Sequence, residues 1–127
     1  MNSKYFTIGA ISTAIAIALG AFGAHGLEDK LTEHYLAVFE TGVRYQMYSS
    51  LGLMLIGLLS QYIGRSKAIV HGARLVIIGM IIFSGSLYIL STTGFSKLGM
   101  ITPLGGVAMI AGWIFIAAAA TKGNKNK

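Results

Sequence analysis

At 127 residues the chain has the length of one domain, yet 54% of its residues are hydrophobic and only 11% are charged. Soluble domains carry about 25% charged residues, so this composition excludes an ordinary water-soluble fold and favours helices in lipid. The absence of cysteine excludes disulfides and thiolate chemistry. The net charge of +6 is distributed at the ends of apolar stretches, so lipid headgroups are expected to contact the basic residues and nucleic acid is not.

Residues 5–24 contain no charged side chain and follow Lys4. A helix needs about 20 apolar residues to cross the hydrocarbon core, so residues 5–24 are predicted to form the first membrane helix. A signal peptide is the alternative, but its apolar region is usually only about 7–15 residues long. Ala16, Gly20 and Ala24 recur at helical spacing, which predicts close contact with a neighbouring helix.

Residues 27–44 have the only amphipathic pattern in the chain. Hydrophobic side chains recur there at spacings of three and four, and all four acidic residues lie among them. Such a segment either lies at the membrane interface or begins the second helix above the membrane. We interpret it as an interfacial segment between the first two membrane helices.

The rest of the chain alternates between apolar stretches and short polar ones. We predict a second membrane helix over 45–63, a third over 68–90, a loop over 91–100, a fourth helix over 102–120 and a disordered polar tail over 121–127. The fourth helix is expected to begin at Thr102 because threonine caps helices well and proline, here Pro103, is favoured at the first helical position. The predicted fold class is all-α, a single integral membrane domain built as a four-helix bundle.

The distribution of lysine and arginine predicts the orientation. With the amino terminus in the cytoplasm, seven of these residues fall in inside segments and three fall outside. The positive-inside rule therefore favours a cytoplasmic location for both termini.

The polar chemistry is concentrated just before the uncharged stretch Leu51–Leu59. Glu40 and Arg44 are four residues apart with the acid first, so they can pair along one helix face. One interpretation is an interfacial anchor in which Arg44 extends to lipid headgroups. The other is an outward-facing polar pocket for a lipid or another ligand, with His25, Glu40, Arg44, Tyr45, Gln46 and Tyr48 as the candidate residues. A single histidine at a helix end is more typical of a capping or headgroup contact than of a metal site, so no metal is expected.

Small residues in the third and fourth helices predict further close packing. These residues are Ser84, Gly85, Ser86, Gly105, Gly106 and Gly112. The free N–H groups at the start of the fourth helix offer an alternative use of that region as an anion site.

Five blocks of sequence match a known family. They are GAFGAHGL (20–27), FETGVRYQMY (39–48), FSGSLY (83–88), ITPLGG (101–106) and AGW (111–113). In these blocks the chain resembles the YgdD/YwdK-type family of small bacterial membrane proteins, a domain of unknown function with small eukaryotic relatives. The resemblance implies a four-helix integral protein of the bacterial cell membrane and assigns no reaction.

Three classes of function follow from these observations. The first is a structural or accessory protein that supports membrane or envelope integrity and contacts lipids, a second copy of itself or other membrane proteins. The alternative is a small oligomeric transporter, channel or lipid-binding module that uses the polar pocket. An enzyme or a bound cofactor is not expected, because the sequence has no convergent set of acidic and histidine side chains and no nucleotide-binding or zinc-protease motif.

Overall fold

The computed structural model of the chain describes residues 4–64 and 66–125, and almost all of these residues are helical. In chain order the elements are α1 (Lys4–Gly26), α2 (Glu33–Ile63), α3 (Lys67–Thr93), the 3-10 helix η1 (Ser96–Met100) and α4 (Thr102–Lys125). The prediction of an all-α fold is confirmed.

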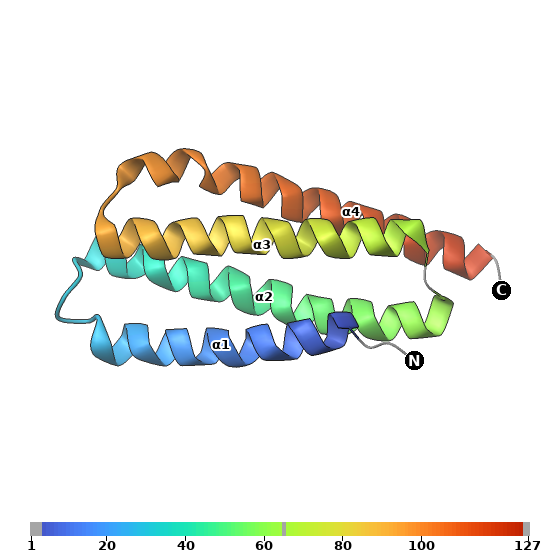
Figure 1. The fold of residues 1–127 in the computed structure, drawn as a ribbon, viewed down its shortest axis with the longest axis horizontal. Coiled ribbons are helices and arrows are strands. Elements are labelled where there is room, and N and C mark those ends of the chain that lie inside the picture. The colour runs from blue at the N-terminus through green and yellow to red at the C-terminus, as the bar shows by residue number, and fades with distance from the viewer. Residues whose placement is uncertain (1–3, 65, 126–127) are drawn as a thin grey trace.

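The four long helices run alongside one another (Figure 1). The most extensive contacts join helices that are consecutive in the chain, and a smaller contact joins α2 to α4. The helices α2 and α3 therefore form the middle of the structure, and α1 and α4 flank them. The turn at residues 27–32 and η1 lie at one end, whereas the two termini lie at the other end (Figure 1).

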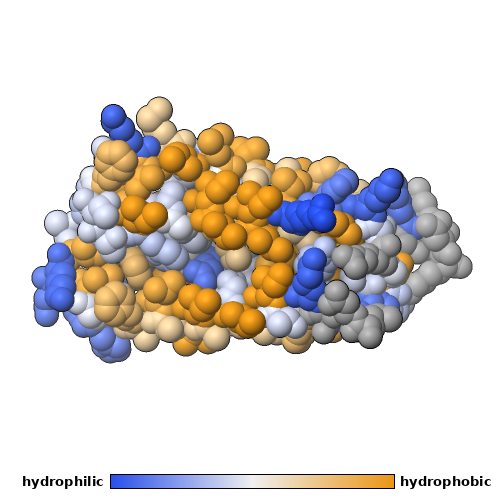
Figure 2. All heavy atoms as spheres, viewed as in Figure 1, coloured by the Kyte–Doolittle hydropathy of each residue, from blue (hydrophilic) through white to orange (hydrophobic). Residues whose placement is uncertain are grey.

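The outer surface of the helices is apolar. Within residues 4–64 and 66–125, three segments are long and apolar enough to cross a membrane: Lys4–Gly26, Lys67–Thr93 and Ser96–Lys122. Isoleucine and leucine side chains such as Ile17, Leu55 and Ile114 are exposed on three different helices. Figure 2 shows hydrophobic residues over the middle of the molecule, with hydrophilic residues gathered mainly toward its two ends. Such a surface suits lipid rather than water as the surrounding solvent.

The helix α2 begins earlier than predicted. Thr32 caps it by accepting a hydrogen bond from the backbone N–H of Tyr35 at 3.2 Å, and the helix then continues without interruption to Ile63. The predicted separate interfacial segment over 27–44 is therefore absent. Residues 27–32 form a turn and residues 33–44 form the beginning of α2, which agrees with the alternative that this stretch begins the second helix. The physical reason is that no proline interrupts this stretch, since the only proline of the chain lies in α4.

The later helices also run further than predicted. The helix α3 ends at Thr93, where Gly94 adopts the left-handed conformation with a φ of 72°, so the predicted loop over 91–100 is shortened and contains η1. The helix α4 begins at Thr102 and includes residues 121–125 of the predicted tail. The alanines before Thr121 favour helix continuation. Residues 126–127 of that tail lie outside the described part of the chain.

Glycine residues bring α3 and α4 very close together. A Cβ atom built on Gly105 would lie 2.5 Å from the backbone nitrogen of Phe83, and one on Gly112 would lie 2.8 Å from the carbonyl oxygen of Gly72. Two helices can approach this closely in lipid only where side chains are absent or small. The α3–α4 contact therefore fixes the position of α4 against the core, whose buried members include Leu53, Ile69 and Val76.

Candidate functional site

The six residues predicted to form a pocket do not all converge on one place. His25 is exposed at the end of α1, and Glu40 and Arg44 are exposed on the outer surface of α2. Tyr45 and Tyr48 line a groove between α2 and α4. Gln46 is buried on the opposite side, toward α1 and α3. Because neighbouring helical residues are about 100° apart around the helix axis, Gln46 faces away from the side of α2 that carries Arg44, Tyr45 and Tyr48.

Gln46 is the centre of a buried hydrogen-bond network that joins three helices. Its Nε2 donates to the backbone oxygen of Ser12 at 3.0 Å and to the Oγ of Ser12 at 3.2 Å. Its Oε1 accepts a hydrogen bond from the hydroxyl of Tyr88 at 2.6 Å. Gln46 therefore links α2 to both α1 and α3 through one side chain.

Ser50 extends this network one helical turn further along α2. Its hydroxyl donates to the Oγ of Ser12 at 2.6 Å and lies 3.5 Å from the sulfur of Met80. We call Ser12, Gln46, Ser50 and Tyr88 the central polar network. Among the described residues, no buried side-chain nitrogen or oxygen lacks a hydrogen-bond partner. The network can therefore lie inside an apolar protein without the cost of unpaired polar atoms.

Three of these residues, Ser12, Ser50 and Tyr88, were not among the candidate residues of the sequence analysis. Ser12 lies within the uncharged stretch predicted as the first helix, and Ser50 follows the candidate residues. The i, i+4 spacing of Gln46 and Ser50 placed two hydrogen-bonding side chains on one face of α2, which is a signal that could have identified the network. A small cavity of about 210 Å³ remains beside it, lined by Ser12, Gln46, Met80, Ile81, Ser84, Gly85 and Tyr88.

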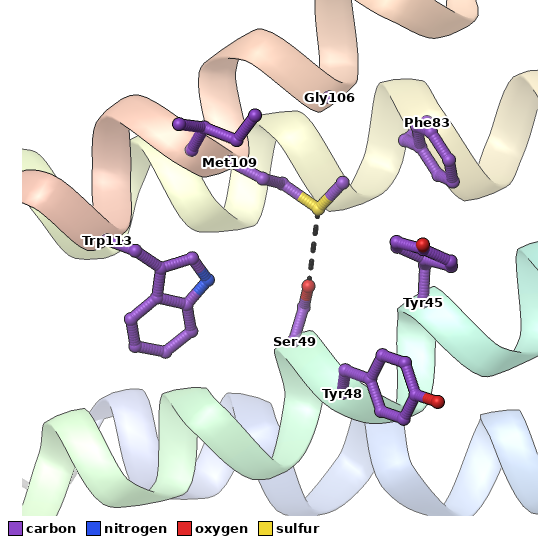
Figure 3. Close-up of a pocket in the computed structure, with 8 residues that line it drawn as sticks. Tyr45, Tyr48, Ser49, Phe83, Gly106, Met109 and Trp113 are labelled. Atoms are coloured by element: carbon purple, nitrogen blue, oxygen red, sulfur yellow. Dashed lines mark hydrogen bonds between the residues drawn. The ribbon is translucent and has the colours of Figure 1, made fainter.

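The other surface of α2 borders a larger hollow, which we call the α2–α4 groove. It has a volume of about 480 Å³ and is lined by Tyr45, Tyr48, Ser49, Phe83, Gly106, Met109, Ile110 and Trp113. Figure 3 shows Trp113 at one end, the rings of Tyr45 and Phe83 at the other, and Ser49 and Met109 between them. The groove exists because α2 and α4 touch over only a small area.

Ring and sulfur contacts hold the walls of the groove. The ring centroid of Tyr45 lies 4.9 Å from that of Phe83 and 5.6 Å from that of Tyr48. The hydroxyl of Ser49 donates to the sulfur of Met109 at 3.3 Å, so the polar group nearest the middle of the groove is already paired. Tyr48 is 59% exposed and Ile110 is 63% exposed, so the groove opens sideways on the outer surface of the helices.

The residues predicted to pack between helices fall into three groups. Five of them are buried: Ala16, Ser84, Ser86, Gly105 and Gly112. Gly20 is half-buried beside Val43, and Gly106 lines the groove. Ala24 is exposed and a Cβ atom on Gly85 would meet nothing within 4 Å, so these two do not mediate a close helix contact. Ala24 comes directly after Gly23, on which Phe39 of α2 packs.

The serines of α3 have specific partners. The hydroxyl of Ser84 donates to the carbonyl oxygen of Gly42 at 2.7 Å, and Ser86 shares a hydrogen bond of 2.6 Å with Thr102. Ser84 therefore joins α3 to α2, and Ser86 joins α3 to the first residue of α4.

Helices of membrane-spanning length with an apolar outer surface define the class, which is that of helical membrane proteins. The chain belongs to the family described as protein of unknown function (DUF423), whose model matches residues 19–106. The predicted family resemblance is thus confirmed.

Curated relatives match over nearly their whole length. The chain is 49% identical to the UPF0382 membrane protein YwdK of Bacillus subtilis over 118 residues, which is 93% of this chain and 96% of that protein. It is 47% identical to the UPF0382 membrane protein SH2409 of Staphylococcus haemolyticus over 113 residues, which is 88% of this chain and 90% of that protein. No solved structure matches the chain at a significant level.

Proposed function

We propose that the chain crosses the bacterial cell membrane four times, with both termini in the cytoplasm. The helix α2 has 31 residues and a length of about 46 Å, which exceeds the hydrocarbon thickness of about 30 Å. Its polar residues Gln46, Ser49 and Ser50 lower its hydropathy, but all three are buried between helices. The location of both termini at one end supports an even number of crossings (Figure 1).

Within that topology we propose a non-enzymatic accessory protein that binds a membrane lipid. The observation that carries this proposal is the α2–α4 groove, which is open on the lipid-facing surface and is not filled by the side chains of the protein. Its volume of about 480 Å³ lies within the range of about 300–1,000 Å³ that is typical of ligand sites. Lipid binding was part of the alternative function in the sequence analysis. The groove makes us favour lipid binding over a purely structural role.

The chemistry of the groove suits an acyl chain. Its walls are mainly aromatic and aliphatic, and its central hydroxyl, that of Ser49, is paired with Met109. An acyl chain in the groove gains dispersion contacts with rigid rings on two sides, which it lacks among mobile lipid tails.

The central polar network supports helix association rather than transport. Its hydrogen bonds run between side chains and backbone groups of α1, α2 and α3. Networks of this kind hold membrane helices together in a defined register. A role in flux would instead require the residues beside the small cavity to exchange these partners for a substrate.

Filling the groove tests the proposal. A Cβ atom on Gly106 would lie 3.7 Å from the nearest atom of Phe83, so leucine at this position enters the groove without meeting the backbone. We expect Gly106→Leu to keep the fold and to reduce the amount of phospholipid that the purified protein retains in detergent, measured by native mass spectrometry. Gly85→Leu is the matched control, because Gly85 is also a helical glycine with free space beside it but lines the small cavity instead of the groove. Equal lipid retention by both variants and the unaltered protein would contradict the proposal.

A further inference from the structure

An ordered set of polar and charged side chains leads from the outer surface of α2 into the groove. Glu40, Arg44 and Tyr48 follow one another at intervals of four residues, and all three are exposed. Residues with this spacing lie on the same side of a helix, about 6 Å apart along its axis. We call these three residues the α2 stripe.

The stripe continues directly into the α2–α4 groove, because Tyr48 belongs to both. Figure 3 shows the ring of Tyr48 at the rim of the groove, with its hydroxyl directed toward the N-terminal part of α2. Aromatic side chains on helices point back toward the N-terminus, which brings the hydroxyl toward the preceding turn. Arg44 is the stripe residue of that preceding turn.

The stripe lies near one end of the membrane-facing part of the bundle. Phe39, next to Glu40, packs on Gly23 close to the end of α1. Glu40 therefore lies close to the level where α1 ends, and Arg44 lies one helical turn deeper. A long arginine side chain at this depth reaches the lipid headgroups readily.

Both charges of the stripe are available to a ligand. The predicted ion pair between Glu40 and Arg44 is not formed, and neither residue pairs with any other in the part of the chain that the structure describes. Arginine binds a phosphate through two parallel N–H groups, and a carboxylate accepts hydrogen bonds from a primary ammonium group. From the groove outward, the stripe thus presents a phenol, a cation and an anion in that order.

One class of membrane lipid has the complementary order. In an aminophospholipid the acyl chain is followed by a phosphate and then, further out, by a primary ammonium group. The three other acidic residues, Glu28, Asp29 and Glu33, lie in the turn and the first residue of α2 beyond Glu40. Lys30 lies in the same turn, so residues 27–33 carry a net charge of −2, which attracts a cationic group and disfavours a lipid with only negative charge.

We propose that the α2 stripe is the headgroup site for an aminophospholipid whose acyl chain lies in the α2–α4 groove. Arg44 binds the phosphate, Glu40 accepts hydrogen bonds from the primary ammonium group, and the hydroxyl of Tyr48 lies at the junction of headgroup and chain. This inference rests on the proposed lipid-binding function and adds the class of lipid and the residues that select it.

The test compares three phospholipids with identical acyl chains on the full-length protein in detergent. Phosphatidylethanolamine has a primary ammonium group, phosphatidylcholine has an ammonium without N–H donors, and phosphatidylglycerol has no ammonium. We expect native mass spectrometry to show the strongest retention for phosphatidylethanolamine. Arg44→Gln should weaken retention of all three by about fivefold, the usual effect of one basic residue near a membrane surface.

Glu40→Gln should act differently, because it should remove the preference for phosphatidylethanolamine rather than weaken the retention of all three lipids. Arg74→Gln is the matched control for Arg44→Gln, since Arg74 is exposed and lies on α3, outside the stripe. Helicity by circular dichroism and the melting temperature without added lipid verify that each variant is folded.

Each outcome separates this inference from the proposed function. Lipid retention without headgroup preference, or a preference unchanged by Glu40→Gln, overturns the proposed headgroup site but not the proposed binding of an acyl chain in the groove. The absence of retained lipid from the unaltered protein overturns both. A lipid-free dimer that Gly106→Leu dissociates would show that a second copy occupies the groove, and it would also overturn the inference.

Discussion

The two sides of α2 use aromatic and polar residues in opposite ways. Toward α1 and α3, Gln46 and Ser50 are buried and their hydrogen bonds are completed within the protein. Toward α4, Tyr45 and Tyr48 border a hollow that no side chain fills. A buried polar group in this fold thus marks helix association, whereas an incompletely filled aromatic surface gives a ligand room to bind.

The largest expected effect comes from the close contact that positions α4 and so shapes the groove. Gly105 and Gly106 are adjacent, but a Cβ on Gly105 would lie 2.5 Å from the backbone nitrogen of Phe83, whereas one on Gly106 has ordinary van der Waals distances. Gly105→Leu is expected to lower the free energy of unfolding by about 3 kcal/mol, because overpacking against backbone cannot be relieved by a rotamer change. Thermal or denaturant unfolding in detergent measures the difference in unfolding free energy between the variant and the unaltered protein. An effect on stability no larger than that of Gly106→Leu would contradict the described α3–α4 contact.

A smaller effect is expected in the central polar network. Gln46→Leu removes the hydrogen bonds to Ser12 and Tyr88, and it leaves the Tyr88 hydroxyl without its partner. Each interhelical hydrogen bond in a membrane contributes about 0.6–2 kcal/mol, so a loss of about 1–3 kcal/mol is expected, together with unchanged lipid retention. Unfolding measurements and native mass spectrometry on the same preparation report the two quantities. If Gln46→Leu lost lipid but kept its stability, the side of α2 that faces α1 and α3 would bind lipid, which contradicts its proposed role in helix association.

The sequence predicted the parts of the fold that depend on local chemistry. An uncharged stretch of membrane-spanning length identified α1, and a threonine followed by proline identified the start of α4. The uninterrupted length of α2 was missed because its charged first turns resemble an interfacial helix. Nothing in local composition distinguishes an amphipathic helix lying on a membrane from one that extends out of it.

The candidate site was less accessible to sequence reasoning. Tyr45 and Gln46 are adjacent, so the sequence offered them as members of one cluster, yet they point to opposite sides of α2. Which side meets α1, α3 or α4 depends on the antiparallel register that brings Ser12 to Ser50. The groove depends further on the small contact between α2 and α4, a property of helix spacing that has no signature in a single helix.

The measurement that tests the lipid-binding account most directly is a structure of the full-length protein determined in lipid nanodiscs. The account predicts elongated density along the α2–α4 groove, between Trp113 and the paired rings of Tyr45 and Phe83, with a headgroup beside Arg44. A groove that is closed by movement of α4, or that is occupied by a helix of a second copy, would contradict it.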